Sequence, residues 1–240
     1  MTNTFASLPN GSLEFTTDSL NRTTAFDRNY GGSYPTPALL LSLTVPEGNK
    51  DQFDYDSRGN LTRKISKPKT GSGLADTITT ATYPTSCVNR KTCNSPEFAV
   101  DANGGRTDYS YSPDHGGLLT VAAPTVAGIR PTKRFTYTQR YAWIKNSGGG
   151  YAQAATPVWV MTATKSCLTS ATVGNSCAGG AADEAITEYD YGPDSGPNNL
   201  WVRGIVETAR GVSLRTCYGY DSYGRKISET SPRAGLATCS

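Results

Sequence analysis

The residues Phe53-Asp54-Tyr55-Asp56-Ser57-Arg58-Gly59-Asn60 form a motif that returns near the C-terminus as Tyr218-Gly219-Tyr220-Asp221-Ser222-Tyr223-Gly224-Arg225. Both copies read aromatic, any residue, Tyr, Asp, Ser, any residue, Gly, polar. Because side chains alternate between the two faces of a strand, the two aromatic rings of each copy share one face. The Asp that follows accepts backbone hydrogen bonds in tight turns, and the Gly tolerates a positive φ. Each copy therefore predicts a strand that runs into a turn, the first half of a hairpin.

Looser copies of this motif occur elsewhere in the chain. Residues 15–22 have Thr at the inner aromatic position and Asn21 at the glycine position, where Asn is the next most tolerant residue. Residues 109–116 and 189–196 carry the ring pairs Tyr109/Tyr111 and Tyr189/Tyr191, followed by a Pro-Asp turn that we expect to be one residue longer. Internal repetition of this kind predicts a repeat architecture.

The repeated motif resembles the RHS or YD-repeat family, on the residues Tyr55-Asp56-x-x-Gly59-Asn60-Leu61 and Tyr220-Asp221-x-x-Gly224-Arg225. Segments similar to it extend from about residue 15 to residue 227. The resemblance implies spiralling β-sheets built from hairpins, which in bacterial polymorphic toxins, insecticidal toxin complexes and animal teneurins close into a hollow shell. By the standards of that family, 240 residues are too few to close a shell.

We therefore predict an all-β repeat architecture of antiparallel hairpins, which forms a twisted, spiralling sheet or strip and part of an RHS-type shell. The prediction is a single domain over residues 1–240, with loop-rich, disulfide-bearing insertions at 69–97 and 166–183. The repeat-motif residues of this prediction are Phe53, Tyr55, Asp56, Gly59, Tyr109, Tyr111, Tyr189, Tyr191, Tyr218, Tyr220, Asp221, Gly224 and Arg225.

The composition agrees with this fold class and argues against nucleic acid and a membrane as partners. The 25 Gly and 14 Pro favour many short strands and turns, and the 14 Tyr suit half-buried sheet faces. The net charge is +3, and the charged residues are interspersed along the chain, so no basic run indicates nucleic-acid binding. No apolar run approaches the roughly 20 residues of a membrane span, and the polar N-terminal residues are not those of a signal peptide.

The six cysteines indicate an oxidising compartment, outside the cell or at its surface. Locality in the sequence favours the disulfides Cys87–Cys93, Cys167–Cys177 and Cys217–Cys239, although six cysteines allow 15 connectivities. Structural zinc is the alternative, but it requires shorter gaps between paired cysteines and more histidine than the one His115. Free thiols are a further alternative. We predict no metal site and no cofactor.

Three groups of residues could carry chemistry. His115 lies beside Asp114 and could act as a general base, but no nucleophile motif accompanies it, so a turn residue is the simpler interpretation. Asp54, Asp56 and Asn60 faintly resemble a calcium loop, as do Asp190, Asp194 and Asn198. Neither set has the glutamate that such a loop requires at its twelfth position, so turn stabilisation accounts for them better. We therefore predict no catalytic residue and no enzymatic activity.

The predicted role is structural: a segment of an extracellular or toxin-associated β-shell, or of a cell-surface fibre assembled through sheet edges. The alternative is a carbohydrate-binding adhesin module that uses the exposed motif tyrosines. A further alternative, an autoproteolytic toxin fragment, lacks the Asp-Pro-x-Gly sequence that would resemble the self-cleaving site of the family.

The expected partners follow from the two ends of a repeat strip. Residues 2–8 and 236–239 contain no charged or proline-bearing device that would cap a sheet edge. We therefore expect these ends to pair with adjacent repeats of a longer chain, or with identical copies in a head-to-tail assembly. Glycans are the partner under the alternative function.

Overall fold

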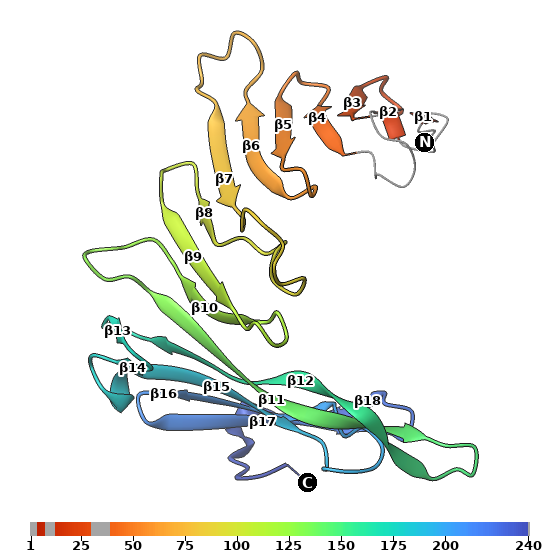
Figure 1. Cartoon of the computed structure of the whole chain (residues 1–240), viewed down its shortest axis with the longest axis vertical. Coiled ribbons are helices and arrows are strands. Elements are labelled where there is room, and N and C mark those ends of the chain that lie inside the picture. Colours follow the sequence, from red (N-terminus) through yellow and green to blue (C-terminus); the bar gives the residue numbers. More distant parts are fainter. Residues whose placement is uncertain (1–3, 8–12, 30–38, 240) are drawn as a thin grey trace. The chain divides into compact units, whose positions relative to one another are not determined.

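The computed structural model of the chain describes residues 4–7, 13–29 and 39–239. Within them, sixteen strands form one antiparallel sheet in which the strand order follows the sequence, from β1 to β12 and then from β15 to β18 (Figure 1). The strands β13 and β14 form a separate two-stranded sheet. The predicted all-β strip of antiparallel hairpins is confirmed.

The strands of the large sheet are β1 (Thr4–Ser7), β2 (Leu13–Thr17), β3 (Thr23–Arg28), β4 (Leu40–Thr44), β5 (Lys50–Tyr55), β6 (Leu61–Lys67), β7 (Thr77–Thr82), β8 (Phe98–Val100), β9 (Arg106–Tyr111), β10 (Leu118–Ala122), β11 (Thr132–Lys145), β12 (Tyr151–Cys167), β15 (Glu184–Tyr191), β16 (Val202–Ala209), β17 (Val212–Tyr220) and β18 (Lys226–Glu229). The small sheet contains β13 (Thr172–Val173) and β14 (Ser176–Cys177), and the two 3-10 turns are η1 (Ala181–Asp183) and η2 (Pro232–Ala234).

Short connections explain the sequential strand order, because antiparallel neighbours can be joined by tight turns. The sheet is open. Among the described strands, β1 pairs only with β2 and β18 pairs only with β17, so these two are its edges. Of the predicted N-terminal pairing segment 2–8, residues 2, 3 and 8 lie outside the described residues, and β1 occupies the remainder.

The chain divides into two compact units, residues 1–107 and residues 108–240. The single domain over 1–240 stays a prediction. Segment 69–97 contains β7, whose sequence Thr-Ile-Thr-Thr-Ala-Thr is rich in β-branched residues and joins the large sheet beside β6. Segment 166–183 contains the small β13–β14 sheet and η1. Both segments therefore hold more regular structure than their composition suggests.

The sheet has little hydrophobic core. Among the described residues, the buried apolar side chains are small, namely Cys93, Ala163, Cys177, Val206 and Cys217, and no large side chain is fully buried. Most strand residues are half-buried instead. Hydrogen-bonded ladders, disulfides and local polar contacts therefore carry much of the stabilisation that a packed core would otherwise supply.

Candidate functional site

The two strong copies of the motif form the same turn between neighbouring strands. In the first, the Asp56 N–H donates to the Asn60 carbonyl (3.0 Å) and the Gly59 N–H donates to the Asp56 carbonyl (3.0 Å). Gly59 has a φ of 82°, as the sequence predicts, and Gly224 has a φ of 78° in the second copy. This is a type I turn followed by a left-handed residue, a common hairpin connection.

The aspartate side chain closes this turn from within. Asp56 Oδ1 accepts hydrogen bonds from the backbone N–H groups of Arg58 (2.8 Å) and Asn60 (2.9 Å), and its Oδ2 accepts one from Asn60 Nδ2 (2.8 Å). Burial of Asp56 raises the pKa of its carboxyl group, but the hydrogen bonds from Asn60 and Arg58 outweigh burial and lower the pKa overall.

The second copy repeats this chemistry with Arg225 in place of the asparagine. Asp221 Oδ1 accepts from the N–H groups of Tyr223 (2.9 Å) and Arg225 (3.0 Å), and Arg225 Nε donates to Asp221 Oδ2 (2.7 Å). These bonds, the Arg225 backbone N–H first, lower the pKa of Asp221. The polar residue after the glycine is therefore the one that binds the second aspartate oxygen, which explains its place in the motif.

The same pair of backbone hydrogen bonds recurs in turns that sequence reasoning did not assign as copies. This pair of bonds is present in the turn that begins at Asp18, which the sequence assigns as a looser copy. It also occurs in the turns that begin at Val45, Asp101 and Asn146, which the sequence analysis did not assign. The Asp101 and Asn146 turns also have the side-chain oxygen bonded to the N–H of the fifth residue. Their Asp/Asn-x-x-Gly spacing was the signal that could have found them, whereas the Val45 turn has no such acid or amide.

The two Pro-Asp turns differ from each other, although the sequence predicted one shared variant. The turn at Ser112 is one residue longer than the Tyr-Asp turn, as expected: the Ser112 N–H donates to the Gly117 carbonyl, at 2.9 Å. The loop after Tyr191 instead closes on Trp201, whose carbonyl accepts from the Gly192 N–H at 2.8 Å. Residues 193–200 therefore form a longer loop, in which Asn198 has a φ of 61°.

The inner tyrosine of the motif has a specific partner across the sheet. The hydroxyl groups of Tyr55, Tyr191 and Tyr220 each donate to a backbone carbonyl of the neighbouring strand, at 2.8 to 2.9 Å; the acceptors are Leu40, Met161 and Val202.

The remaining ring residues of the motif are also half-buried. The rings of Tyr109 and Tyr111 stack with centroids 6.5 Å apart, and Lys ammonium groups lie over Phe53 (5.9 Å) and Tyr218 (5.5 Å). Tyr189 lies along the cavity described below.

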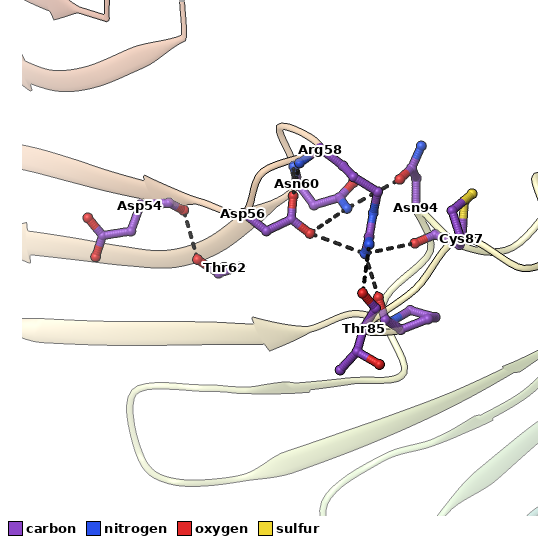
Figure 2. A network of polar contacts seen from close by, with 10 residues as sticks. Asp54, Asp56, Arg58, Asn60, Thr62, Thr85, Cys87 and Asn94 are labelled. Atoms are coloured by element: carbon purple, nitrogen blue, oxygen red, sulfur yellow. Dashed lines mark hydrogen bonds and ion pairs between the residues drawn. A yellow bond between two sulfur atoms is a disulfide. The ribbon is translucent and has the colours of Figure 1, made fainter.

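The first Tyr-Asp turn holds the disulfide-bearing loop of segment 69–97, as Figure 2 shows. The Arg58 guanidinium donates to the carbonyl groups of Pro84 (2.5 Å), Thr85 (3.3 Å) and Cys93 (3.4 Å), while it pairs with Asp56 at 3.3 Å. Next to it, Asn60 Nδ2 lies 3.3 Å from Asn94 Oδ1. The variable position of the motif thus anchors a loop that lies far away in sequence.

The last Tyr-Asp turn also receives a distant loop. Asn198 Nδ2 donates to the Asp221 carbonyl at 2.7 Å, and the Trp201 ring packs on Tyr220 with centroids 5.4 Å apart. A Cβ atom at Gly224 would lie 3.2 Å from the Trp201 ring. In both strong copies the turn therefore serves as a docking point for another part of the same unit.

The structure forms the three disulfides that locality favours, Cys87–Cys93, Cys167–Cys177 and Cys217–Cys239. Among the described residues, one group has the composition of a metal site: Cys167, Cys177 and Asp183. Its two sulfur atoms are bonded to each other, and the Asp183 carboxylate accepts hydrogen bonds from the N–H and hydroxyl groups of Thr169 and Ser170. The group therefore organises the 166–183 loop.

The pKa of the Asp183 carboxyl group is far below its ordinary value. The hydroxyl groups of Ser170 and Thr169 lower its pKa from 3.8 to about 2, with further help from their backbone N–H groups. Arg134 and Glu184, the residue after Asp183, form a mostly buried ion pair at 2.9 Å, and Arg134 also lies 3.8 Å from the Cys177 sulfur. Sequence reasoning missed this ion pair because its partners are 50 residues apart.

The other candidate groups have structural partners. His115 Nδ1 accepts from the Gly117 N–H at 3.1 Å, and its ring packs against those of Tyr137 and Trp159, with centroid distances of 4.5 and 4.6 Å. In the first of the two sets that resemble a calcium loop, the Asp56 carboxylate accepts hydrogen bonds from backbone N–H groups of its own turn. Asp190 is paired with Arg215. These contacts agree with the turn and packing interpretations.

An open cavity of about 630 Å³ lies in the second unit, beside the end of β15. Its polar lining includes Arg140, Arg203 and Arg215 together with Asp190 and Asp194. Sequence reasoning did not assign a site here, because these residues come from separate strands and one loop.

The described part of the chain contains no helix that is long and apolar enough to cross a membrane.

No family model and no curated protein matches the chain. Solved structures of toxin complexes are similar to it at low identity. The crystal structure of TcdB2-TccC3-Cdc42 matches with a TM-score of 0.46 and 12% identity, over 95% of this chain and 11% of that chain. TcdB2-TccC3-TEV matches with a TM-score of 0.45 and 15% identity, over the same shares.

A structure of the Photorhabdus luminescens Tc holotoxin pore matches with a TM-score of 0.43 and 11% identity, over 94% of this chain and 12% of that chain. The chain thus spans about a tenth of the length of these toxin-complex chains.

Proposed function

We propose that the chain is a non-enzymatic structural repeat protein, a segment of an extracellular or toxin-associated β-shell or of a surface fibre. The observation that carries this proposal is the unbroken sequential order of the sixteen-stranded sheet, with an edge strand at each end of the series. Such a sheet extends by adding hairpins, and each hairpin is buried against its neighbours. The resemblance of the Tyr-Asp motif to the RHS family supports the same role.

The edge strands supply the means of assembly. The outer backbone groups of β1 and β18 have no ladder partner among the described strands. All four residues of β18 are exposed, and Ile227 on it is 69% exposed. Exposed edges of this kind favour pairing with a further strand. We propose adjacent repeats of a longer chain as the first partner, and identical copies as the second.

Glycan binding by the motif tyrosines is the weaker candidate. A sugar-stacking surface requires exposed ring faces, but the motif rings are half-buried. The hydroxyl groups of Tyr55, Tyr191 and Tyr220 are in addition bonded to backbone carbonyls. The three disulfides support an extracellular location, since such bonds persist in oxidising compartments.

Concentration-dependent association tests this proposal. The purified chain should associate in light scattering, and negative-stain microscopy should show strips or fibres rather than uniform particles. Ile227→Lys should reduce the association, because a charge on an edge strand disfavours strand addition. The matched control is Ala25→Lys, at an exposed residue of β3 that has a ladder partner on each side, Phe15 of β2 and Thr44 of β4.

A well-behaved monomer whose β1 and β18 amides are protected from hydrogen exchange would contradict the proposal, because it would indicate a self-capped domain. Equal effects of the two lysine substitutions would contradict the assignment of the assembly surface to the edge.

A further inference from the structure

The cavity beside β15 contains an arginine without a partner. Arg203 lines it from β16 and is half-buried. Among the described residues, no hydrogen bond or ion pair reaches its guanidinium group. Its nitrogen atoms keep contact with solvent, so their donors are available to a ligand that enters the cavity. Arg203 is therefore a charged donor that lacks its acceptor.

A β-bulge places Arg203 in the cavity. In the β15–β16 ladder, Asp190 pairs with Gly204 and Tyr191 pairs with Val202, so Arg203 is the extra residue between two registers. Bulges re-aim a side chain and are frequent next to functional sites. The same cavity receives Thr162, which is the extra residue at the register shift between β11 and β12, where Thr136 pairs with Ala163 and Tyr137 with Met161.

The other two arginines of the cavity are held in place. Arg140 Nη2 donates to the Gly192 and Pro193 carbonyls, at 2.9 and 3.0 Å, and its Nη1 lies 3.4 Å from the fully exposed carboxylate of Asp194. Arg215 forms an ion pair with Asp190. The two aspartates thus have partners already, and the uncompensated charge in the cavity is the positive charge of Arg203.

Space and polarity define what could bind. A volume of about 630 Å³ is within the usual range of small-molecule sites, and it is too large for a lone ion. The hydroxyl groups of Thr138 and Thr162 add neutral hydrogen-bonding capacity beside the arginines. A guanidinium fork matches the geometry of a carboxylate or phosphate group.

We propose that this cavity binds a small polar ligand carrying one oxyanionic group, carboxylate or phosphate, which pairs with Arg203. Glucuronate, which carries a carboxylate, and glucose 6-phosphate, which carries a phosphate, serve as probes for the two forms of that group. This inference does not rest on the structural role proposed above, because the cavity lies within residues 108–240 and involves neither edge strand.

Titration of the full chain with glucuronate, glucose 6-phosphate and neutral glucose tests the site. Calorimetry gives the affinities, and the Nε–Hε resonance of Arg203 reports contact in the unmodified protein. One or both charged sugars should bind and shift this resonance, and the one that binds more tightly identifies the form of the group. Absence of binding by both charged sugars up to about 10 mM would overturn the proposal, as would equal binding of glucose.

Three variants separate the site from general charge effects. Arg203→Gln should weaken binding about tenfold or more, the usual loss for a charge-assisted hydrogen bond. Arg203→Lys should weaken it less, since it retains the charge but loses the fork. Arg210→Gln, at an exposed residue of the turn that joins β16 to β17, removes the same charge outside the cavity and should bind like the unmodified chain. Unchanged affinity in Arg203→Gln would overturn the assignment; if that variant does not fold, the Arg203 resonance decides.

Discussion

The hydroxyl group of Tyr220 donates a hydrogen bond to the backbone carbonyl of Val202 at 2.8 Å, from β17 to the neighbouring strand β16. Tyr55 and Tyr191 make the equivalent contact in their own copies of the motif. A phenylalanine would fill the same half-buried position but would leave the carbonyl without this donor. The contact therefore explains why tyrosine stands at the inner position rather than any aromatic residue.

We expect Tyr220→Phe to lower the free energy of unfolding by about 1 kcal/mol, the usual net value of a partly buried hydrogen bond. Urea denaturation followed by circular dichroism measures this change. Tyr218→Phe is the matched control on the same strand, because no hydrogen bond of its hydroxyl is found among the described residues and its ring contact with Lys226 is retained. Equal destabilisation by the two substitutions would argue against a specific role for the Tyr220 hydroxyl.

Gly59 separates backbone strain from crowding. Its φ is 82°, and a Cβ atom built there meets only Leu39, at 3.9 Å. Gly59→Ala should therefore cost about 1 kcal/mol of unfolding free energy through strain alone. Gly59→Asn should cost less, because Asn tolerates the left-handed region. In the copy at residues 15–22, Asn21 already occupies that region, with a φ of 58°. Denaturant melts of the two variants test this order, and the reverse order would contradict it.

Arg58 should control the stability of the loop that it holds. Arg58→Ala removes the donor for the Pro84, Thr85 and Cys93 carbonyls, so the amides of residues 89–95 should exchange on the order of tenfold faster. Hydrogen exchange with residue resolution measures this effect. Arg63→Ala is the control: it lies on the next strand of the same hairpin and makes only an exposed ion pair with Asp54, at 3.6 Å. Unchanged exchange in the loop of Arg58→Ala would show that the disulfide alone holds it.

Asp183 should make the stability of the second unit depend on pH in the acid range. Its folded-state pKa, about 2, is below the ordinary value of 3.8. Its contribution to stability is therefore fully present above about pH 4 and is lost as the pH falls through about 2. Denaturant melts between about pH 5 and pH 2 should show the stability difference between the unmodified chain and Asp183→Asn shrinking as the pH falls. A difference that is constant over this range would contradict the prediction.

Much of the fold follows from local sequence patterns. The Asp-x-x-Gly spacing predicts the hairpin turns because every hydrogen bond in the turn joins residues within four positions of each other, as at Asp56 and Asn60. Alternating aromatic residues predict strands for the same reason: the period of two is a property of the extended backbone. The spacing of the cysteines favours the pairs that the structure contains, since both partners of the two shorter loops lie close in sequence.

The contacts between turns and distant loops could not be predicted in this way. Arg58 meets Pro84 and Cys93 only once the β5–β6 hairpin and the disulfide loop have taken their places, and nothing in the local sequence specifies that approach. The acceptors of the tyrosine hydroxyls depend on which strand lies alongside and in which register. Arg203 enters its cavity because the ladder slips by one residue between Asp190 and Tyr191. The motif turns are determined by short segments of sequence, because their hydrogen bonds are local. Register is a property of paired strands, so the docked loops and the cavity arise only when distant strands pair.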